Sequence, residues 1–444
     1  MLALSIEKKR ELRVFLRMLA NTVGAVGLVA VLASCSTSPG YSYTIGGTVS
    51  GMVGSGMVLQ NNGGDDRSIS ANGSFSFDTP LTAQTAYTIT VKTQPANPSQ
   101  TCSVSNGSGI INGAPVDNVV VNCVTGPTSI TVDPSGQFAY ATNTNGTISA
   151  YTINQTTGAL GVGTAVAAGT YPTSVTVDPS GQFAYAVDTI GGAICAYTIE
   201  TDGTLTALGT PVSAGAYPTS ITVDHSGQFV YVANMGDGTI SAYTINQTTG
   251  ALGVGTAVTA GTYPTSVVTV LVGSLEFAYA TNSGDGTISA YTIDQTTGAL
   301  TALGTPVATG TYPTSVTVDP SGKFAYVANE SSNNISVYTI NQTTGALVAG
   351  TAMAAGTSPT SVVTVLVGSS EFAYATNSGD GTISAYTIDP TYGTLTALGT
   401  PVTAGTYPAS VTVDPLGRFA YVANMGGGNI LVYKINSDGT LTPQ

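Results

Sequence analysis

The chain has 444 residues, of which only 7% are charged, 55 are Gly and none is Trp. This composition excludes a coiled coil and suits many short strands joined by tight turns. The net charge is −13, and half of the ten basic residues fall within the first 17 positions. The five that remain cannot neutralise a run of phosphates, so no nucleic-acid partner is expected.

Residues 1–34 have the organisation of a signal peptide. A basic segment, residues 8–17, precedes an apolar segment, Met18–Ala33, that is too short and glycine-rich for a permanent membrane span. The sequence Leu32-Ala33-Ser34-Cys35 resembles a bacterial lipobox, which implies cleavage before Cys35 and a lipid anchor on it. The alternative is an ordinary secretory signal with a chance cysteine. Ser36, in place of aspartate, favours the outer membrane, facing the periplasm or the outside.

A lipidated tether, residues 35–42, leads into a small β module over residues 43–125. Runs such as Tyr87-Thr88-Ile89-Thr90-Val91 alternate as strands, and Asn-Gly pairs supply turns. A small sandwich is expected, and it resembles the immunoglobulin-like modules that many bacterial surface lipoproteins carry. Export to an oxidising compartment predicts a disulfide between Cys102 and Cys123. Cys195 is then expected to be a lone thiol on a strand.

Seven copies of one unit of about 46 residues fill residues 126–444. The unit contains four short β-runs, with an Asp-Pro-Ser-Gly turn between the first two in most copies. A period of this size is typical of a β-propeller with one blade per repeat. The sequence therefore predicts an all-β fold, a seven-bladed β-propeller preceded by a small immunoglobulin-like β-sandwich module. The prolines that open the repeats are Pro127, Pro172, Pro218, Pro264, Pro313, Pro359 and Pro408.

Two repeats and the last blade depart from the pattern. Repeats four and six replace the Asp-Pro-Ser-Gly turn with a longer apolar one, at residues 266–274 and 361–369. Repeat seven ends within the stretch that forms the outer strand of the other repeats, so an incomplete outer strand is expected. Because Cys123 ties the preceding residues to the β module, they have little slack to complete that blade. The prediction is a ring closed by packing of blade seven on blade one.

The run Tyr-Val-Ala-Asn at Tyr231–Asn234, Tyr326–Asn329 and Tyr421–Asn424 resembles the YVTN repeat. With seven copies, residues 127–444 are similar to the seven-bladed lactonase-like propeller family, which includes 6-phosphogluconolactonase-type proteins. The resemblance implies the fold, and for activity it implies a lactone hydrolase. The shared residues, however, are turn and packing residues.

Few side chains in the repeats are candidates for chemistry. His225, the single histidine, is either a general base or, as its place in a hairpin turn favours, a surface residue. The turns around Asp237, Asp285 and Asp380 could hold calcium, but they lack dense oxygen ligands, so turn chemistry is favoured. No metal site, no cofactor and no catalytic residue is predicted.

Tyrosine precedes the opening proline in five of the seven repeats, where Gly126 and Ser358 are the exceptions. In a propeller this loop lies on one face near the central channel, so a partial ring of tyrosines could stack on a sugar or grip a peptide. The alternative, favoured because repeated residues usually serve the repeat itself, is that each tyrosine wedges between neighbouring blades. The candidate ligand-binding residues are Tyr171, Tyr217, Tyr263, Tyr312 and Tyr407.

These observations favour a membrane-anchored binding or structural protein of the cell envelope. Its partner would be a saccharide, a peptide or an envelope protein, and Cys35 would hold it to the membrane. The alternative, a lactone hydrolase, needs polar groups that converge at the channel. The propeller has only Lys323, Arg418 and Lys434 as cations, and the first two occupy an edge position after a turn glycine. A phosphorylated sugar acid would find little positive charge.

Overall fold

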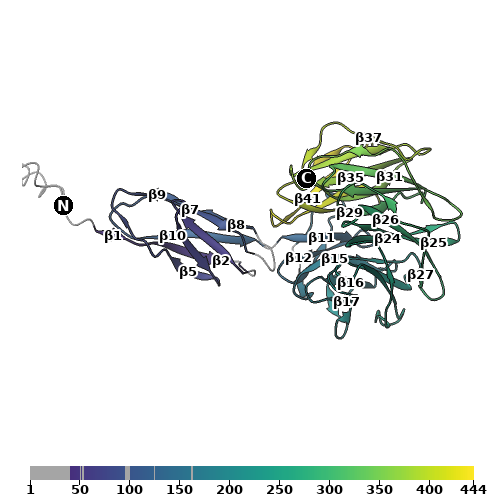
Figure 1. Ribbon diagram of the computed structural model, residues 1–444, viewed down its shortest axis with the longest axis horizontal. Helices are drawn as coiled ribbons and strands as arrows, with labels where there is room; N and C mark the ends of the chain where they lie inside the picture. Colours follow the sequence, from purple (N-terminus) through teal and green to yellow (C-terminus); the bar gives the residue numbers. More distant parts are fainter. Residues whose placement is uncertain (1–40, 51, 53–54, 96–100, 125, 162–163) are drawn as a thin grey trace, which may run out of the picture.

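The computed structural model describes residues 41–50, 52, 55–95, 101–124, 126–161 and 164–444. Every regular element in these ranges is a β-strand, which confirms the all-β prediction. Accordingly, the described ranges contain no helix long and apolar enough to cross a membrane. The leader and Cys35 lie outside them. Figure 1 shows a small β module followed by a larger ring of sheets.

The β module has two four-stranded sheets that share one apolar core, and β1 and β6 form a further two-stranded sheet. The sheet orders are β5-β2-β10-β8 and β4-β3-β7-β9, and β2 runs parallel to β10. Ile45, Met57, Leu59, Val119 and Val121 are fully buried between them. The immunoglobulin-like assignment of this module stays a prediction. The strands are β1 (Ser42–Tyr43), β2 (Ile45–Ser50), β3 (Met57–Asn61), β4 (Asp65–Ile69), β5 (Gly73–Ser76), β6 (Leu81–Thr82), β7 (Ala86–Thr93), β8 (Thr101–Ser105), β9 (Ser108–Ile110) and β10 (Val116–Val124).

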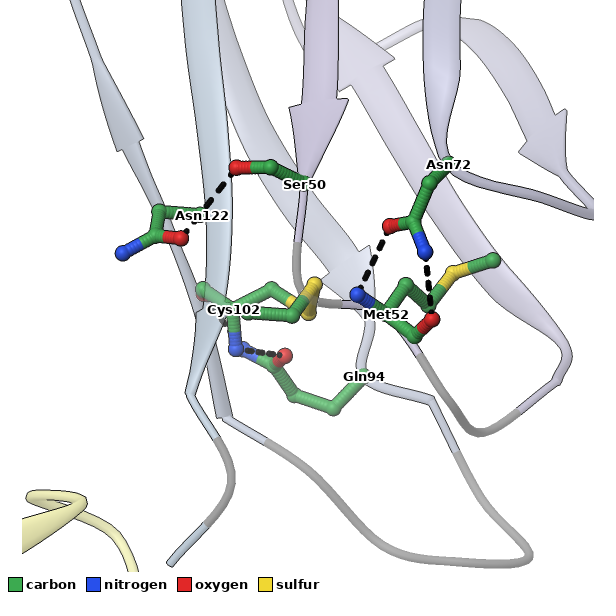
Figure 2. Close-up of a disulfide and its surroundings, with 7 residues drawn as sticks. Ser50, Met52, Asn72, Gln94, Cys102 and Asn122 are labelled. Carbon is green, nitrogen blue, oxygen red and sulfur yellow. Dashed lines mark hydrogen bonds between the residues drawn. A yellow bond between two sulfur atoms is a disulfide. The ribbon is translucent and has the colours of Figure 1, made fainter. Parts of the chain in front are cut away.

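The predicted disulfide joins the last two long strands of the first sheet. Cys102 on β8 and Cys123 on β10 lie opposite each other in the antiparallel register and are bonded, with both side chains 4% exposed. Gln94 stabilises the backbone at this disulfide. Its side chain accepts from the Cys102 N–H at 2.7 Å and donates to the Cys102 carbonyl at 3.1 Å (Figure 2). Cys195 is free and buried in the propeller, as expected.

The propeller has seven antiparallel sheets whose innermost strands form a closed ring. Neighbouring innermost strands contact each other all the way round, including β39 with β11. At six junctions the threonine that follows the opening proline donates its hydroxyl to a carbonyl at the start of the next innermost strand, as Thr360 Oγ1 does to the Pro408 carbonyl at 2.8 Å. The innermost strands are β11 (Pro127–Val132), β15 (Pro172–Val177), β20 (Pro218–Val223), β24 (Pro264–Val272), β29 (Pro313–Val318), β34 (Pro359–Val367) and β39 (Pro408–Val413).

The second strand of each blade is buried on both faces, which explains its apolar or small residues at successive positions. Its tyrosine donates to a glycine carbonyl of the next blade at six junctions, for example Tyr326 Oη to Gly393 at 2.9 Å. The blades are therefore joined by buried hydrogen bonds as well as by packing. These strands are β12 (Phe138–Asn143), β16 (Phe183–Asp188), β21 (Phe229–Asn234), β25 (Leu275–Asn282), β30 (Phe324–Asn329), β35 (Ser370–Asn377) and β40 (Phe419–Asn424).

The third and outer strands complete each sheet, and the outer strand is split in blades two, four, five and six. The third strands are β13 (Thr147–Thr152), β17 (Ala193–Ile199), β22 (Thr239–Thr244), β26 (Thr287–Ile293), β31 (Asn334–Ile340), β36 (Thr382–Ile388) and β41 (Asn429–Ile435). The outer strands are β14 (Thr164–Ala167), β18 (Leu205–Ala207) with β19 (Val212–Ser213), β23 (Thr256–Thr259), β27 (Leu300–Ala302) with β28 (Val307–Ala308), β32 (Leu347–Ala349) with β33 (Met353–Ala354), β37 (Leu395–Ala397) with β38 (Val402–Thr403), and β42 (Leu441–Pro443).

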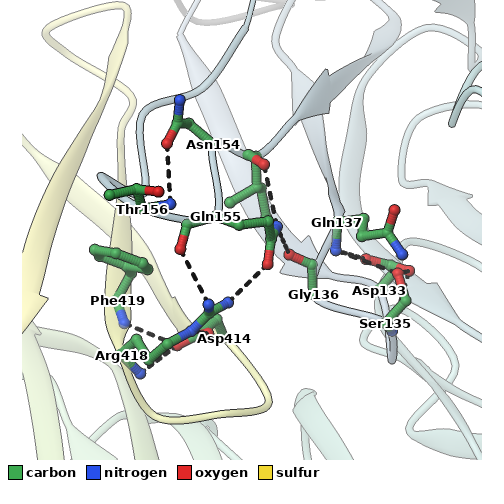
Figure 3. A network of polar contacts seen from close by, with 11 residues as sticks. Asp133, Ser135, Gly136, Gln137, Asn154, Gln155, Thr156, Asp414, Arg418 and Phe419 are labelled. Atoms are coloured by element: carbon green, nitrogen blue, oxygen red, sulfur yellow. Dashed lines mark hydrogen bonds and ion pairs between the residues drawn. The ribbon is translucent and has the colours of Figure 1, made fainter.

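The ring closes between blades seven and one without a strand from upstream of Gly126. The short strand β42 comes from the end of the chain, and β10 stays in the β module. Two atoms at this junction, Tyr421 Oη and Asn424 Oδ1, are buried without a hydrogen-bond partner among the described residues. Arg418 compensates, since its guanidinium reaches Gln155 of blade one (Figure 3). Arg418 is therefore a clamp between two blades, whereas the sequence had suggested only an edge residue.

Candidate functional site

One face of the propeller is built from two kinds of loop that meet at the start of the innermost strands. The first loop carries the tyrosine before each opening proline, and the second joins the second and third strands of the same blade. In every blade the residue after the second strand donates its N–H to the carbonyl of the tyrosine position, as Glu330 does to Tyr312 at 2.9 Å. The two loops are thus tied together seven times around the channel.

Four of the five tyrosines are held in a strained conformation and are exposed. Tyr217, Tyr263, Tyr312 and Tyr407 have φ between 51° and 58°. This left-handed region costs a non-glycine residue roughly 1–2 kcal/mol. Their side chains are 43–55% exposed, so these four do not serve as buried wedges between blades. Ser358, at the same position in blade six, has a φ of 53° as well, so this conformation belongs to the loop and not to the tyrosine alone.

Glycines of the second loop make room for two of these rings. A Cβ on Gly236 would lie 2.9 Å from Cδ2 of Tyr217, and one on Gly284 would lie 2.7 Å from Cδ2 of Tyr263. A larger residue would push the ring away, whereas glycine lets one edge of it rest on the loop. The remaining ring surface is open to solvent and is suited to stacking on a flat or ring-shaped ligand.

The acidic turns hold the tyrosine loops in place. Asp237 accepts from the Ala216 N–H at 2.6 Å, Asp285 from the Thr262 N–H at 2.9 Å and Asp380 from the Thr357 N–H at 2.8 Å. Each donor directly precedes the tyrosine position, so these carboxylates position that residue. Their observed role is turn and loop chemistry. Within the described residues no cluster of three or more His, Cys, Asp or Glu could hold a metal ion.

The tyrosine of blade two is anchored differently. Asp188 replaces the asparagine of the other blades, is 4% exposed and accepts from the N–H groups of Thr170 and Tyr171, both at 2.8 Å. The Tyr171 hydroxyl lies 3.9 Å from the Met425 sulfur of blade seven. Since Gly126 provides no side chain in blade one, Tyr171 reaches across that blade.

Two of the tyrosines have a raised pKa. Burial raises the pKa of Tyr407, and the nearby Glu330 carboxylate and Tyr312 raise it further. The pKa of Tyr171 is also raised, by burial and by Tyr407. Tyr171, Tyr312 and Tyr407 belong to blades two, five and seven. We name Tyr171, Tyr217, Tyr263, Tyr312, Tyr407 and Glu330 the tyrosine mouth.

Glu330 is the functional candidate that the sequence analysis did not single out. It occupies the position after the second strand, where the other blades carry Thr144, Thr189, Met235, Ser283, Ser378 and Met425. It is therefore the one charged member of a ring of seven. It is half-buried, and desolvation raises its pKa above the ordinary glutamate value. A comparison of the repeats at this column, rather than a search for a motif, would have found it.

His225 and the propeller lysine and arginine residues that could serve an enzyme lie elsewhere. His225, Lys323 and Arg418 sit in or beside the turns at the far end of the innermost strands. There the buried Glu276 of the longer blade-four hairpin accepts from the His225 N–H at 2.9 Å. His225 also lines a cavity of about 490 Å³ between β20, β24 and β29. The histidine is thus an exposed turn residue, well removed in the fold from the tyrosine mouth.

Comparison with known proteins gives a family and a set of folds. A family described as "Lactonase, 7-bladed beta-propeller" matches residues 138–268, 269–364 and 364–444. Among curated proteins none matches significantly. The structure is similar to that of a putative 6-phosphogluconolactonase from Bacteroides uniformis, with 23% identity over 71% of this chain and 94% of that one and a TM-score of 0.60.

Two further solved structures show how widely this fold is used. A periplasmic gluconolactonase from Pseudomonas aeruginosa is 21% identical over 67% of this chain and 91% of its own, with a TM-score of 0.58. The hydrazine synthase of Kuenenia stuttgartiensis is 18% identical over 70% of this chain and 96% of its own, with a TM-score of 0.57. At these identities the similarity establishes the fold alone.

Proposed function

The chain belongs to the family of seven-bladed β-propeller lactonases, and from this premise we propose that it binds an uncharged sugar ring or sugar lactone at the tyrosine mouth. The observation that carries the proposal is the set of exposed tyrosines held at positive φ around the channel. Flat aromatic surfaces with a hydroxyl at one end suit the apolar face and the polar rim of a sugar.

The charge around the mouth defines the ligand class. Among the described residues that form it, Glu330 is the single charged side chain, and no Lys or Arg belongs to it. A phosphate group would meet a carboxylate and no cation, which disfavours a phosphorylated sugar acid. The ligand is therefore a neutral ring rather than a 6-phosphogluconate derivative.

Loss of one exposed ring is expected to weaken this binding. Replacing Tyr312 or Tyr407 with alanine should lower the affinity for glucono-δ-lactone or a neutral glucoside roughly five- to thirtyfold, because a stacked aromatic surface is removed. Isothermal titration measures this change. Tyr392→Ala is the matched control, since Tyr392 is 71% exposed but lies in a turn of blade six away from the mouth. Equal affinities of all three variants and the wild type would contradict the proposal.

The same site supports a second candidate function, hydrolysis of a neutral lactone. The favouring observation is that Glu330 is half-buried, has a raised pKa and contributes to the raised pKa of Tyr407. Glu330 would take a proton from a water molecule as that water attacks the lactone carbonyl carbon. Tyr407, kept protonated by its raised pKa, would donate to the developing oxyanion. The ring C–O bond then breaks, and the leaving oxygen takes the proton to give the hydroxy acid.

Turnover by this route has a defined pH dependence. The base must be ionised, so the rate should rise with pH through the pKa of Glu330, with a midpoint above the ordinary glutamate value. Glu330→Gln should lower any turnover about 100-fold or more while retaining ligand affinity within a fewfold. A pH–rate profile of the wild type and the variant checks this. Turnover that is unaffected by Glu330→Gln would remove Glu330 from the mechanism and leave binding as the function.

We place the protein in the bacterial cell envelope, anchored through lipid on Cys35. The support is the order of basic segment, apolar segment and Leu32-Ala33-Ser34-Cys35, and several acyl chains on one residue give stable anchoring. Replacing Cys35 with alanine should move the protein from the membrane fraction to the soluble fraction. An intact-mass measurement that finds an unmodified N-terminus at another residue would contradict the anchor.

A further inference from the structure

At six of the seven junctions between blades, a short outer segment of the chain fills the space between two blades. The Val or Met at its start pairs with the isoleucine of the third strand, and all six isoleucines are 0% exposed. The segment therefore seals the apolar edge of its own blade. The pairs are Val166–Ile148, Val212–Ile194, Val258–Ile240, Val307–Ile288, Met353–Ile335 and Val402–Ile383.

The same segment makes two recurring hydrogen bonds. The carbonyl of its second residue accepts from a tyrosine of the following blade at 2.6–3.1 Å, as the Thr403 carbonyl does from Tyr433. The N–H of its third residue donates to the carbonyl that precedes the third strand, as Ala404 does to Gly381 at 2.7 Å. Each filled junction thus has one apolar contact, one hydroxyl bond and one backbone bond in common.

The seventh junction, between blades seven and one, offers the same groups without that segment. Ile430 is half-buried and has no outer strand paired to it, and the Tyr151 hydroxyl has no hydrogen-bond partner among the described residues. A space of about 250 Å³ lies between the two blades at this point. We name it the open junction. It is lined by uncharged residues that include Asn143, Thr147, Ser149, Tyr151, Asn429 and Ile430.

The β module explains why this junction is open. In the blades that follow blade one, the residue six positions before the opening proline is the Val or Met of the filling segment, as Val402 is before Pro408. The residue six positions before Pro127 is Val121, which instead belongs to β10 and pairs with β2 and β8. The disulfide at Cys123 fixes β10 in the module. The residues that would fill the open junction therefore form a strand of the β module instead.

We propose that the open junction binds an extended peptide segment of a partner protein, which adds as a strand to β41. Strand addition takes its affinity from main-chain hydrogen bonds and its specificity from side-chain pockets. The six native segments define the chemistry that fits: Val or Met, then Ala, Ser or Thr, then Ala or Thr, then Gly. The partner segment is accordingly uncharged, with one medium-sized apolar side chain over Ile430 and small residues beside Tyr151.

A synthetic peptide provides the probe. The end-blocked octapeptide with the sequence of residues 398–405, Leu-Gly-Thr-Pro-Val-Thr-Ala-Gly, should bind the intact protein saturably in a fluorescence anisotropy titration. The same peptide with Asp in place of the valine should not bind, because a charge would be placed on Ile430. Tyr151→Phe should weaken the affinity for the octapeptide about three- to tenfold, since one hydrogen bond is lost. Tyr197→Phe, the matched change at a filled junction, should leave that affinity unchanged.

A second variant tests the proposal even if the free octapeptide binds only weakly. Adding Gly-Thr-Pro-Val-Thr-Ala-Gly after Gln444 continues β42 in the register of blade six, so the added residues should fill the open junction in cis. This variant should have a higher melting temperature and should no longer bind the octapeptide. The proposal is overturned if the wild type shows no saturable binding, or if the extended variant binds as the wild type does. Equal amide protection at Asn429–Leu431 and at the filled junctions of the purified protein would also overturn it.

Discussion

Replacing Arg418 with alanine is expected to lower the free energy of unfolding of the propeller by about 3 kcal/mol. Arg418 Nε lies 2.8 Å from the Asp414 carboxylate, which is 0% exposed. Its other nitrogens donate to the backbone carbonyl and the side-chain oxygen of Gln155, at 3.1 and 3.0 Å. The variant leaves a buried charge without its cation and removes two bonds across the closing junction. Urea denaturation measures the loss.

The neighbouring repeats supply the controls for this prediction. In four other blades a serine two residues after the aspartate donates to the carboxylate, but blade seven has Leu416 there and Arg418 takes over that contact. The double change Leu416→Ser with Arg418→Gln should restore the turn and leave a residual loss of about 1 kcal/mol from the bonds to Gln155. Lys323→Ala, at the same position in blade five, should change stability by less than about 0.5 kcal/mol. An Arg418→Ala variant as stable as the wild type would contradict the clamp.

Removing the disulfide of the β module is expected to cost it about 3 kcal/mol, because the bond closes a loop across 21 positions. Replacing both Cys102 and Cys123 with alanine should therefore speed amide hydrogen exchange in β8 and β10 roughly 100-fold. The strands of the propeller should keep their protection, since they have their own cores. Hydrogen-exchange mass spectrometry of the full chain separates the two parts.

The matched control for the disulfide is the third cysteine of the described chain. Cys195→Ser places in blade two the residue that Ser149 and Ser241 provide in blades one and three. It should leave exchange in β8 and β10 unchanged. Unchanged exchange in the double cysteine variant as well would mean that sheet pairing and Gln94 alone hold the module together.

Local signals in the repeat were enough to predict most of the fold. The Asp-Pro-Ser-Gly turn, the Phe and Tyr of the second strand and the proline of the first strand each specify an element from its own residues. In repeats four and six the sequence predicted a longer apolar turn, whereas most of those residues extend the innermost strand, since β24 and β34 run for nine residues. The free thiol and the disulfide followed from the same kind of local reasoning.

Contacts between residues that lie far apart in the sequence could not be predicted from such local signals. Arg418 and Gln155 are 263 positions apart, and only ring closure brings them together. The Tyr171 hydroxyl of blade two likewise lies 3.9 Å from the Met425 sulfur of blade seven. The sequence placed the tyrosines on one face near the channel, but their exposure and positive φ depend on loop anchors such as Asp237 and Asp285. These features arise from the geometry of the ring, which no single repeat encodes.

A crystal soaked with glucono-δ-lactone, or with the gluconate that it yields, would test the central claim most directly. The account predicts density for a sugar or sugar acid in van der Waals contact with Tyr312 and Tyr407, with a polar atom within hydrogen-bond distance of Glu330. Soaking the Tyr312→Ala variant under the same conditions should remove that density. Density found only in the cavity beside His225 at the far end of the innermost strands, or equal density in the variant, would contradict a binding site at the tyrosine mouth.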